Sequence, residues 1–269
     1  MSDSKSKIYV VGIGPGSPDH ITPAAKNAIE TSDIIVGYKT YLDLIQDMIR
    51  DKEVMSSGMR QEVDRCAKAV ELAQDGKTVA VICSGDPGIY AMAGLVFELL
   101  SAEERKSGSV EAKTSQLPNL RASGLSVEVI PGIPALSACA SRLGAPLMHD
   151  FAAISLSDLL TPWELIEKRL EAAASADFVI VIYNPKSKGR PHNIKKARDI
   201  VLKHRSPVTP VGIVKGATRE NETVTITDLQ HMLDKEIDMQ STVIIGNSNT
   251  FTWQERMVTP RGYEKKYKI

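Results

Sequence analysis

The stretch KIYVVGIGPGS, residues 7–17, decides the fold class of this chain. It begins as an apolar run, which predicts a buried strand over 7–14, and it ends in closely spaced glycines and a proline, which predict a tight turn. Strands that are buried on both faces are typical of parallel sheets with helices packed on each side. We therefore expect an α/β architecture that starts with this strand.

The rest of the N-terminal half alternates strand and helix patterns. Apolar runs predict further strands over 33–36, 53–55, 78–83 and 126–130. Helical spacing predicts helices over 23–31, with Thr22 as N-cap, and over 41–50, 60–74, 90–100 and 135–142. Such alternation favours a mostly parallel sheet covered by helices. The polar segment 101–124 interrupts the pattern and is expected to be an exposed insertion.

A hinge is predicted at Gly144, Ala145 and Pro146. We expect it to separate an N-terminal α/β domain, 1–146, from a C-terminal α/β domain, 147–269. In the second half, strands are expected over 151–156, 178–183, 208–215, 222–226, 241–246 and 252–258, and helices over 163–174, 192–204 and 229–233. Because the last strands are separated by only one short helix, this domain is expected to contain a mixed sheet.

Composition excludes several classes of protein. The 33 Lys and Arg residues balance 33 Asp and Glu residues, so the basic surplus that neutralises nucleic-acid phosphates is missing. No uninterrupted apolar stretch reaches the ~20 residues needed to cross a bilayer. Cys66, Cys83 and Cys139 lie far apart, and the histidines show no metal-ligand spacing. We expect a cytoplasmic protein that binds no nucleic acid, no membrane and no metal.

The turn after the first strand resembles the dinucleotide fingerprint G-x-G-x-x-G but departs from it. Ser17 replaces the third glycine, Pro15 removes a backbone donor, and Pro18 keeps the loop from running straight into a helix. Asp33 stands at the beginning of the second strand, whereas a ribose-binding acid belongs at its end. A nicotinamide-dependent oxidoreductase and a turn without any ligand remain alternatives.

Two more loops of small residues follow predicted strands: SGDPGIY, 84–90, and PGIPA, 131–135. Small residues let a ligand approach the backbone closely, and Asp86 can accept hydrogen bonds from hydroxyl groups or from the loop backbone. In open α/β sheets, ligands bind beyond the carboxyl ends of the strands, where all three loops are expected. None contains the Gly-Lys-Ser/Thr of a phosphate cradle. The set favours a ligand with hydroxyl groups and an adenine but no phosphate.

The motifs VGIGPGS, SGDPGIY, IPGIPALSACA, IVIYNP, IVKGATRENE and IIGNS, in this order, resemble the tetrapyrrole methylase family. The resemblance covers nearly the whole chain except 101–124. It implies a homodimeric enzyme that binds S-adenosylmethionine between two α/β domains and releases S-adenosylhomocysteine. Carried over residue by residue, it implies cofactor contacts from Pro15, Ser84, Gly85, Asp86, Ile89, Pro134, Ala135, Tyr183, Asn184, Gly216, Ala217, Gly246, Asn247 and Ser248.

Within this family, three segments resemble the group that methylates precorrin-3B, or its cobalt-containing analogue, at C(17) with ring contraction in cobalamin biosynthesis. They are GYKTYLDLI, SSGMRQEVDRCAKAVELA and YNPKSKGRPHNIKKARDI. Members that act on uroporphyrinogen carry an Asp where Lys39 stands and a Lys where Met59 stands. The sequence does not decide between a metal-free and a cobalt-bound substrate. Methylation of another tetrapyrrole, at C(20), C(11) or the uroporphyrinogen positions, and a non-catalytic corrinoid-binding module are the alternatives.

Methyl transfer from a sulfonium is an in-line displacement, so the main task of such an enzyme is to position the attacking carbon. The candidate catalytic residues are Lys39, Arg60 and His20. Lys39 and Arg60, with Lys186 and Arg190 as further candidates, would hold the substrate carboxylates, although each could be an ordinary surface charge. His20 follows the first glycine loop and is the candidate acid or base for the proton transfers of ring contraction.

Overall fold

The protein is described by a computed structural model that covers residues 6–106 and 125–267. The chain divides into two compact units, Met1–Pro134 and Ala135–Ile269. The sequence places the boundary after Pro146, but α5 (Ala135–Leu143) and β6 (Gly144–Ala145) belong to the second unit, where β6 pairs with β13 (Arg256–Val258). The predicted hinge is therefore part of a small sheet. Most of the predicted insertion, 107–124, lies outside the described residues.

The first unit contains a parallel sheet of five strands in the order β3-β2-β4-β1-β5. The strands are β1 (Lys7–Gly12), β2 (Ile34–Tyr38), β3 (Glu53–Ser57), β4 (Thr78–Cys83) and β5 (Ser126–Ile130). The parallel sheet predicted from the sequence is confirmed. Because all five strands run in one direction, their carboxyl ends lie along one edge of the sheet.

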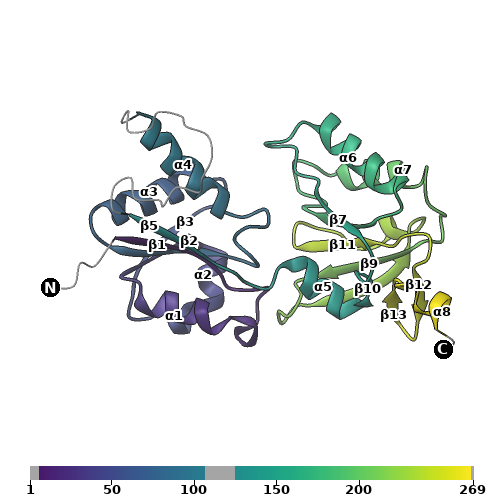
Figure 1. Ribbon diagram of the computed structural model, residues 1–269, viewed down its shortest axis with the longest axis horizontal. Coiled ribbons are helices and arrows are strands. Elements are labelled where there is room, and N and C mark those ends of the chain that lie inside the picture. The colour runs from purple at the N-terminus through teal and green to yellow at the C-terminus, as the bar shows by residue number, and fades with distance from the viewer. Residues whose placement is uncertain (1–5, 107–124, 268–269) are drawn as a thin grey trace. The chain divides into compact units, whose positions relative to one another are not determined.

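Helices cover both faces of this sheet (Figure 1). One face carries α1 (Pro23–Thr31) and α2 (Lys39–Leu42), and the other carries α3 (Glu62–Gln74) and α4 (Ala93–Lys106). In the inner strand β1, Val11 packs in the core beneath α1 and Val10 in the core beneath α3 and α4. Successive residues of the strand thus enter opposite cores, which explains why the strands are apolar throughout.

Helix α3 begins two residues later than predicted, and two other helices of this unit differ more from the sequence prediction. The segment 41–50 is not one helix but α2 followed by a 3-10 helix, Asp43–Met48, with a kink at Ile45 (φ −125°, ψ 18°). Leu42 packs directly on Gly37, where a Cβ atom would lie 2.8 Å from the leucine side chain. Helix α4 begins at Ala93 because Tyr90 has a left-handed φ of 53°. It continues to Lys106 through polar residues that are good helix formers.

The second unit contains a mixed sheet in the order β10-β9-β11-β8-β7, as the sequence predicts. Strands β7 (Phe151–Ser155), β8 (Val179–Tyr183) and β9 (Pro210–Lys215) share one direction, whereas β10 (Thr223–Asp228) and β11 (Ser241–Ile245) run the opposite way. Consequently, the carboxyl ends of β7, β8 and β9 lie at the same end of the sheet as the amino ends of β10 and β11.

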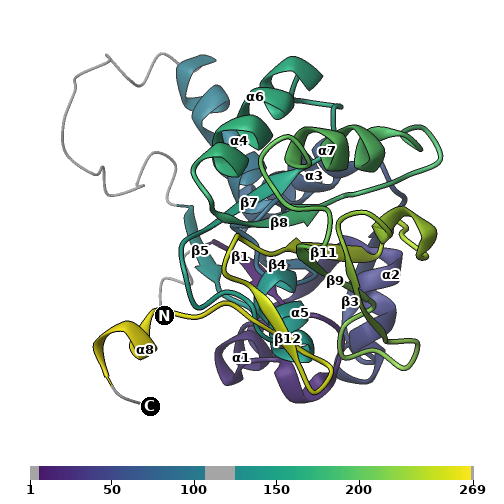
Figure 2. The same ribbon diagram turned by 90° about the vertical axis from the view of Figure 1, so that its right-hand side faces the viewer.

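Helices α6 (Trp163–Ser175) and α7 (Asn193–Val201) cover one face of the mixed sheet, and α5 covers the other (Figures 1 and 2). Leu143 of α5 packs so closely on Gly212 that a Cβ atom there would lie 2.3 Å from the leucine side chain. The predicted helix 192–204 is shorter at both ends, and the predicted helix 229–233 is a 3-10 turn, Met232–Asp234. No helix in the described part of the chain could span a bilayer.

The segment 252–258, predicted as one strand, is a hairpin of β12 (Phe251–Trp253) and β13. The two turn residues, Gln254 and Glu255, have φ values of 43° and 59°. Two-residue hairpin turns with two positive φ angles usually contain Asn or Gly. This turn contains neither, so the sequence carries no hairpin signal. The last described helix is α8 (Tyr263–Lys266).

Candidate functional site

The strand order of the first unit sorts the predicted site residues into two adjoining groups. The three glycine loops follow β4, β1 and β5, which are neighbours in the sheet. Lys39 and Arg60 follow β2 and β3, the next two strands on one side. Ligands of open α/β sheets bind at the carboxyl edge of the strands. The three glycine loops therefore lie at this edge side by side with the segments that carry Lys39 and Arg60, which we call the basic segments.

The three loops contact one another through glycine backbones. Gly14 and Gly85 form a two-way bridge, in which Gly14 N donates to Gly85 O at 3.2 Å and Gly85 N donates to Gly14 O at 2.8 Å. A Cβ atom on Gly132 would lie 2.1 Å from Gly85 O, and one on Gly12 would lie 2.7 Å from Gly132 N. Only glycine fits at Gly12 and Gly132. These glycines thus let the three loops pack backbone against backbone.

Asp86 ties the second loop to the third. Its Oδ1 accepts a hydrogen bond from Gly88 N at 2.8 Å, and its Oδ2 accepts one from Gly132 N at 3.2 Å. The Asp86 carbonyl accepts a further bond from Ile89 N at 3.3 Å. Both carboxylate oxygens thus serve the backbone of the loops. Of the two roles that the sequence allows, this geometry supports organisation of the loops more directly than binding of a hydroxyl group.

The other predicted residues of these loops lie close to the same backbone cluster. Pro15 and Gly85 are buried, whereas Ser84, Ile89 and Pro134 are half-buried. His20 ends a 3-10 helix, Pro18–His20, and its carbonyl oxygen would lie 2.9 Å from a Cβ atom on Gly14. The His20 ring nitrogen Nδ1 is buried and has no hydrogen-bond partner among the described residues. His20 is thus beside the first loop, as the sequence predicts.

Lys39 and Arg60 are both exposed at the adjoining strand ends. Lys39 Nζ contacts the two carboxylate oxygens of Asp43 at 3.0 and 3.1 Å. The Lys39 side chain thus has a carboxylate partner four residues further along the chain. Arg60 has a left-handed φ of 67°, and its backbone N donates to Glu62 Oε1 at 3.2 Å. This strained turn directs a basic residue out of the loop.

The thiols of this unit are unsuited to nucleophilic chemistry. Cys83 ends β4 directly before the second loop, and burial raises the pKa of its thiol to about 12. Burial likewise raises the pKa of Cys66 to about 11. Both groups are therefore protonated near neutral pH, and the thiolate is the reactive form. Among the described residues, no group of three or more His, Cys, Asp or Glu side chains is arranged to hold a metal.

In the second unit, one end of the mixed sheet carries four of the predicted residues, Tyr183, Asn184, Gly216 and Ala217. Tyr183 Oη accepts a hydrogen bond from Leu136 N at 2.9 Å. Asn184 has a left-handed φ of 51° and donates from Nδ2 to Ser155 Oγ at 2.9 Å, joining the ends of β8 and β7. These residues follow β8 and β9, which run in the same direction.

Gly246, Asn247 and Ser248 lie at the opposite end of the same sheet. They follow β11, which is antiparallel to β8 and β9, and Gly246 N donates to Pro210 O at the start of β9. Strands of five and six residues separate the two ends, which is about 15–20 Å. Ser248 donates from N and Oγ to Asp177 at 3.0 and 2.7 Å. The structure does not bring this turn together with Tyr183 and Gly216, so we do not include it among the residues proposed to bind the cofactor.

The amino end of β11 also lies at this end of the sheet, which the sequence does not indicate. Ser241 pairs with Lys215, and Gly216 N donates to Gln240 O at 3.4 Å. The beginning of β11 thus lies beside Gly216. The sequence directs attention to the carboxyl ends of strands alone, because ligands bind there in parallel sheets. The reversed direction of β11 places its other end there.

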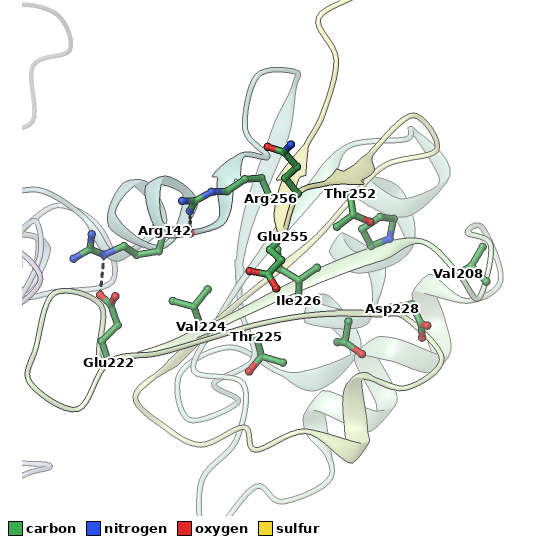
Figure 3. Close-up of a pocket in the computed structure, with 13 residues that line it drawn as sticks. Arg142, Val208, Glu222, Val224, Thr225, Ile226, Asp228, Thr252, Glu255 and Arg256 are labelled. Atoms are coloured by element: carbon green, nitrogen blue, oxygen red, sulfur yellow. Dashed lines mark hydrogen bonds and ion pairs between the residues drawn. The ribbon is translucent and has the colours of Figure 1, made fainter.

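A cavity of about 1000 Å³ lies elsewhere in the second unit (Figure 3). It is lined by the edge strand β10 and the β12–β13 hairpin, and the ion pair between Arg142 and Glu222, 2.8 Å long, lies at one end of it. None of the residues predicted for catalysis or cofactor binding lines it. We assign it no part in the site.

Residues 7–233 match a protein family, the Tetrapyrrole (Corrin/Porphyrin) Methylases. The chain is 53% identical to a cobalt-factor III methyltransferase of Priestia megaterium, in an alignment that covers 98% of this chain and 46% of that protein. It is 48% identical to a probable cobalt-factor III C(17)-methyltransferase of Salmonella typhimurium, covering 95% of this chain and 99% of that protein. The chain thus spans about half the length of the first relative and nearly all of the second.

Solved structures share the fold. The crystal structure of the methyltransferase CobJ has a TM-score of 0.83 and 33% identity, covering 95% of this chain and 100% of that chain. A Thermus thermophilus uroporphyrin-III C-methyl transferase, complexed with S-adenyl homocysteine, has a TM-score of 0.63 and 21% identity, covering 89% of this chain and 97% of that chain. At that identity, the second likeness concerns the fold alone.

Proposed function

The chain belongs to the tetrapyrrole methylase family, and from this premise we propose that it transfers a methyl group from S-adenosylmethionine to C(17) of cobalt-factor III, with ring contraction, in cobalamin biosynthesis. The observation that carries the proposal is the packing of three glycine loops at the carboxyl ends of β4, β1 and β5. None of these loops contains a phosphate-binding motif, and they lie beside the basic segments that follow β2 and β3. The cobalt-containing substrate is chosen over metal-free precorrin-3B because the relative that the chain matches over 99% of its length is named a probable cobalt-factor III C(17)-methyltransferase.

The residues present fit S-adenosylmethionine. A cradle in which Cβ atoms on Gly12 and Gly132 would collide with backbone suits a ligand that is read through backbone groups. The residues proposed to hold it are Pro15, Ser84, Gly85, Asp86, Ile89, Pro134 and Ala135, and Tyr183, Asn184, Gly216 and Ala217. When bound, the cofactor supplies an electrophilic methyl group on a sulfonium. The protein aligns it with the attacking carbon.

The basic segments are proposed to hold the tetrapyrrole. Exposed Lys39 and Arg60 would form charge-assisted hydrogen bonds to substrate carboxylates. His20 is proposed as the proton donor or acceptor during ring contraction, since its Nδ1 lacks a partner in the described part of the chain. We further propose a homodimer that works in the cytoplasm, as the family resemblance implies.

The test is to incubate the purified protein with methyl-labelled S-adenosylmethionine and cobalt-factor III, precorrin-3B or uroporphyrinogen III. We expect label at C(17) of a ring-contracted product from cobalt-factor III, identified by mass and NMR, and none from uroporphyrinogen III. Label at C(20) or C(11) would refute the position of methylation and leave the family intact. Binding of cobalt-factor III without any transfer of label would instead favour the corrinoid-binding module.

A further inference from the structure

Arg65 is a buried cation at the carboxyl edge of the first sheet. It lies in α3 and is only 4% exposed. Its guanidinium donates from Nε to Ser57 Oγ at 2.6 Å, from Nη2 to Gly58 O at 2.8 Å and from Nη1 to Met92 Sδ at 3.3 Å. All three acceptors are neutral. Within the described residues, Arg65 forms no ion pair with a carboxylate.

The second unit holds a buried arginine that has a counter-charge. Arg205 is 8% exposed, donates to the carbonyl oxygen of Phe178 at 3.3 Å and forms an ion pair with Asp177 at 3.1 Å. Burying a charge costs several kcal/mol unless a counter-charge and hydrogen bonds offset it. Arg205 has both, whereas Arg65 has the hydrogen bonds alone. The missing counter-charge at Arg65 requires an explanation.

The contacts of Arg65 connect the segments that surround the proposed site. Ser57 ends β3, and Gly58 begins the turn that carries Arg60. The guanidinium carbon lies 5.9 Å from the centre of the Tyr38 ring, at the end of β2 directly before Lys39. Met92 follows the second glycine loop. One side chain thus joins both basic segments to the end of a proposed cofactor loop.

We propose that Arg65 is a positioning residue for the tetrapyrrole substrate. Its side chain holds the Tyr38–Lys39 and Ser57–Arg60 segments in place and adds a positive potential, and the substrate carboxylates supply the missing counter-charge. A buried charge without a counter-ion is weakly screened, so it raises the potential over the neighbouring surface. The inference rests on the proposed function, because it requires an anionic tetrapyrrole at this edge of the sheet.

Two variants, Arg65→Lys and Arg65→Met, test the inference, with Arg205→Lys as the matched control. Lysine keeps the charge but lacks the fork that reaches three acceptors at once, so we expect the KM for cobalt-factor III to rise about tenfold. Methionine removes both the charge and the hydrogen bonds of the guanidinium, so we expect the KM to rise about a hundredfold. In all three variants, kcat and the affinity for S-adenosylhomocysteine stay within about twofold of wild type. Arg205→Lys lowers the thermal midpoint and leaves the KM unchanged.

A purely structural role predicts a different pattern. Partial unfolding reduces the active fraction and hence the apparent kcat, but it leaves the KM of the folded molecules unchanged. Unchanged KM values in folded Arg65→Lys and Arg65→Met protein, with wild-type turnover intact, would overturn this inference alone. Wild-type protein that methylates no tetrapyrrole would overturn the proposed function as well. If Arg65→Met does not fold, the KM of Arg65→Lys decides.

Discussion

Two glycine turns of this chain look alike in sequence but occupy different kinds of strand end. Gly85 follows β4 in a parallel sheet and packs against Gly14 and Gly132. Gly246 follows β11 in a mixed sheet and packs against Thr250, whose Cβ would lie 2.6 Å from a Cβ on the glycine. In a parallel sheet, every carboxyl end reaches the ligand edge. In a mixed sheet, the direction of the strand decides whether a glycine turn is part of the site.

The largest effect is expected from Gly132→Ala, which forces a Cβ atom against backbone in the centre of the loop cluster. Neither the Gly85 carbonyl nor the Gly12 backbone can move cheaply, so we expect a loss of roughly 1–3 kcal/mol of stability and loss of S-adenosylhomocysteine binding. Calorimetric titration and denaturant unfolding measure both quantities. Gly94→Ala is the control, because nothing lies within 4 Å of a Cβ atom there. Wild-type affinity in Gly132→Ala would contradict the proposed cradle.

A smaller effect is expected from Asp86→Asn. The amide has only one acceptor oxygen, so it cannot serve both Gly88 N and Gly132 N. Hydrogen bonds to a charged group contribute about 1.5–3 kcal/mol, and part of this should appear as weaker cofactor binding in a titration. Asp33→Asn is the control, since Asp33 accepts a similar bond from Thr78 N at the start of β4. Equal dissociation constants for Asp86→Asn and wild type, with folding intact, would show that the carboxylate is dispensable.

On the substrate side of the same edge, Lys39→Ala and Arg60→Ala should impair turnover of cobalt-factor III without disturbing the cofactor. We expect cofactor affinity to stay within about twofold, a change under about 0.5 kcal/mol. Steady-state kinetics and a separate titration measure the two effects. Arg50→Ala is the control, because Arg50 forms a comparable exposed ion pair with Asp47. A matching loss of cofactor affinity would mean that the two groups of residues are not separate.

The smallest effect is expected from Ser248→Ala in the turn that we exclude from the site. Its hydroxyl donates to Asp177 at 2.7 Å, so its removal should cost about 1 kcal/mol of stability. Binding of S-adenosylhomocysteine should not change. A tenfold loss of cofactor affinity in folded Ser248→Ala protein would return this turn to the site.

The sequence predicts most reliably where local spacing decides the structure. The bounds predicted for β4 and β5 agree with the structure, and Thr22 caps α1 by accepting a hydrogen bond from Ala25 N at 3.1 Å. The sequence could not predict the strand order that brings three loops together, because this order depends on contacts between distant segments. The direction of β11 depends on such contacts as well, whereas the turn at Gln254 and Glu255 was missed because neither residue is typical of a hairpin turn.

Arg65 does leave a signal in the sequence. It precedes Ala69 by four positions and so shares the buried face of α3 with it. An arginine on the apolar face of a helix is unusual, because long charged side chains are rarely fully buried without a partner. The sequence could not show what Arg65 contacts, because its partners come from three other segments of the chain: Ser57, Tyr38 and Met92.

Hydrogen–deuterium exchange with and without S-adenosylhomocysteine tests most directly which glycine turns hold the cofactor. We predict slower exchange on binding over 12–17, 84–90 and 131–135 in the first unit and around Asn184 and Gly216 in the second. We predict no change over 246–250, which lies at the other end of the mixed sheet. Protection of 246–250 together with unchanged exchange over 84–90 would contradict the proposed cofactor site.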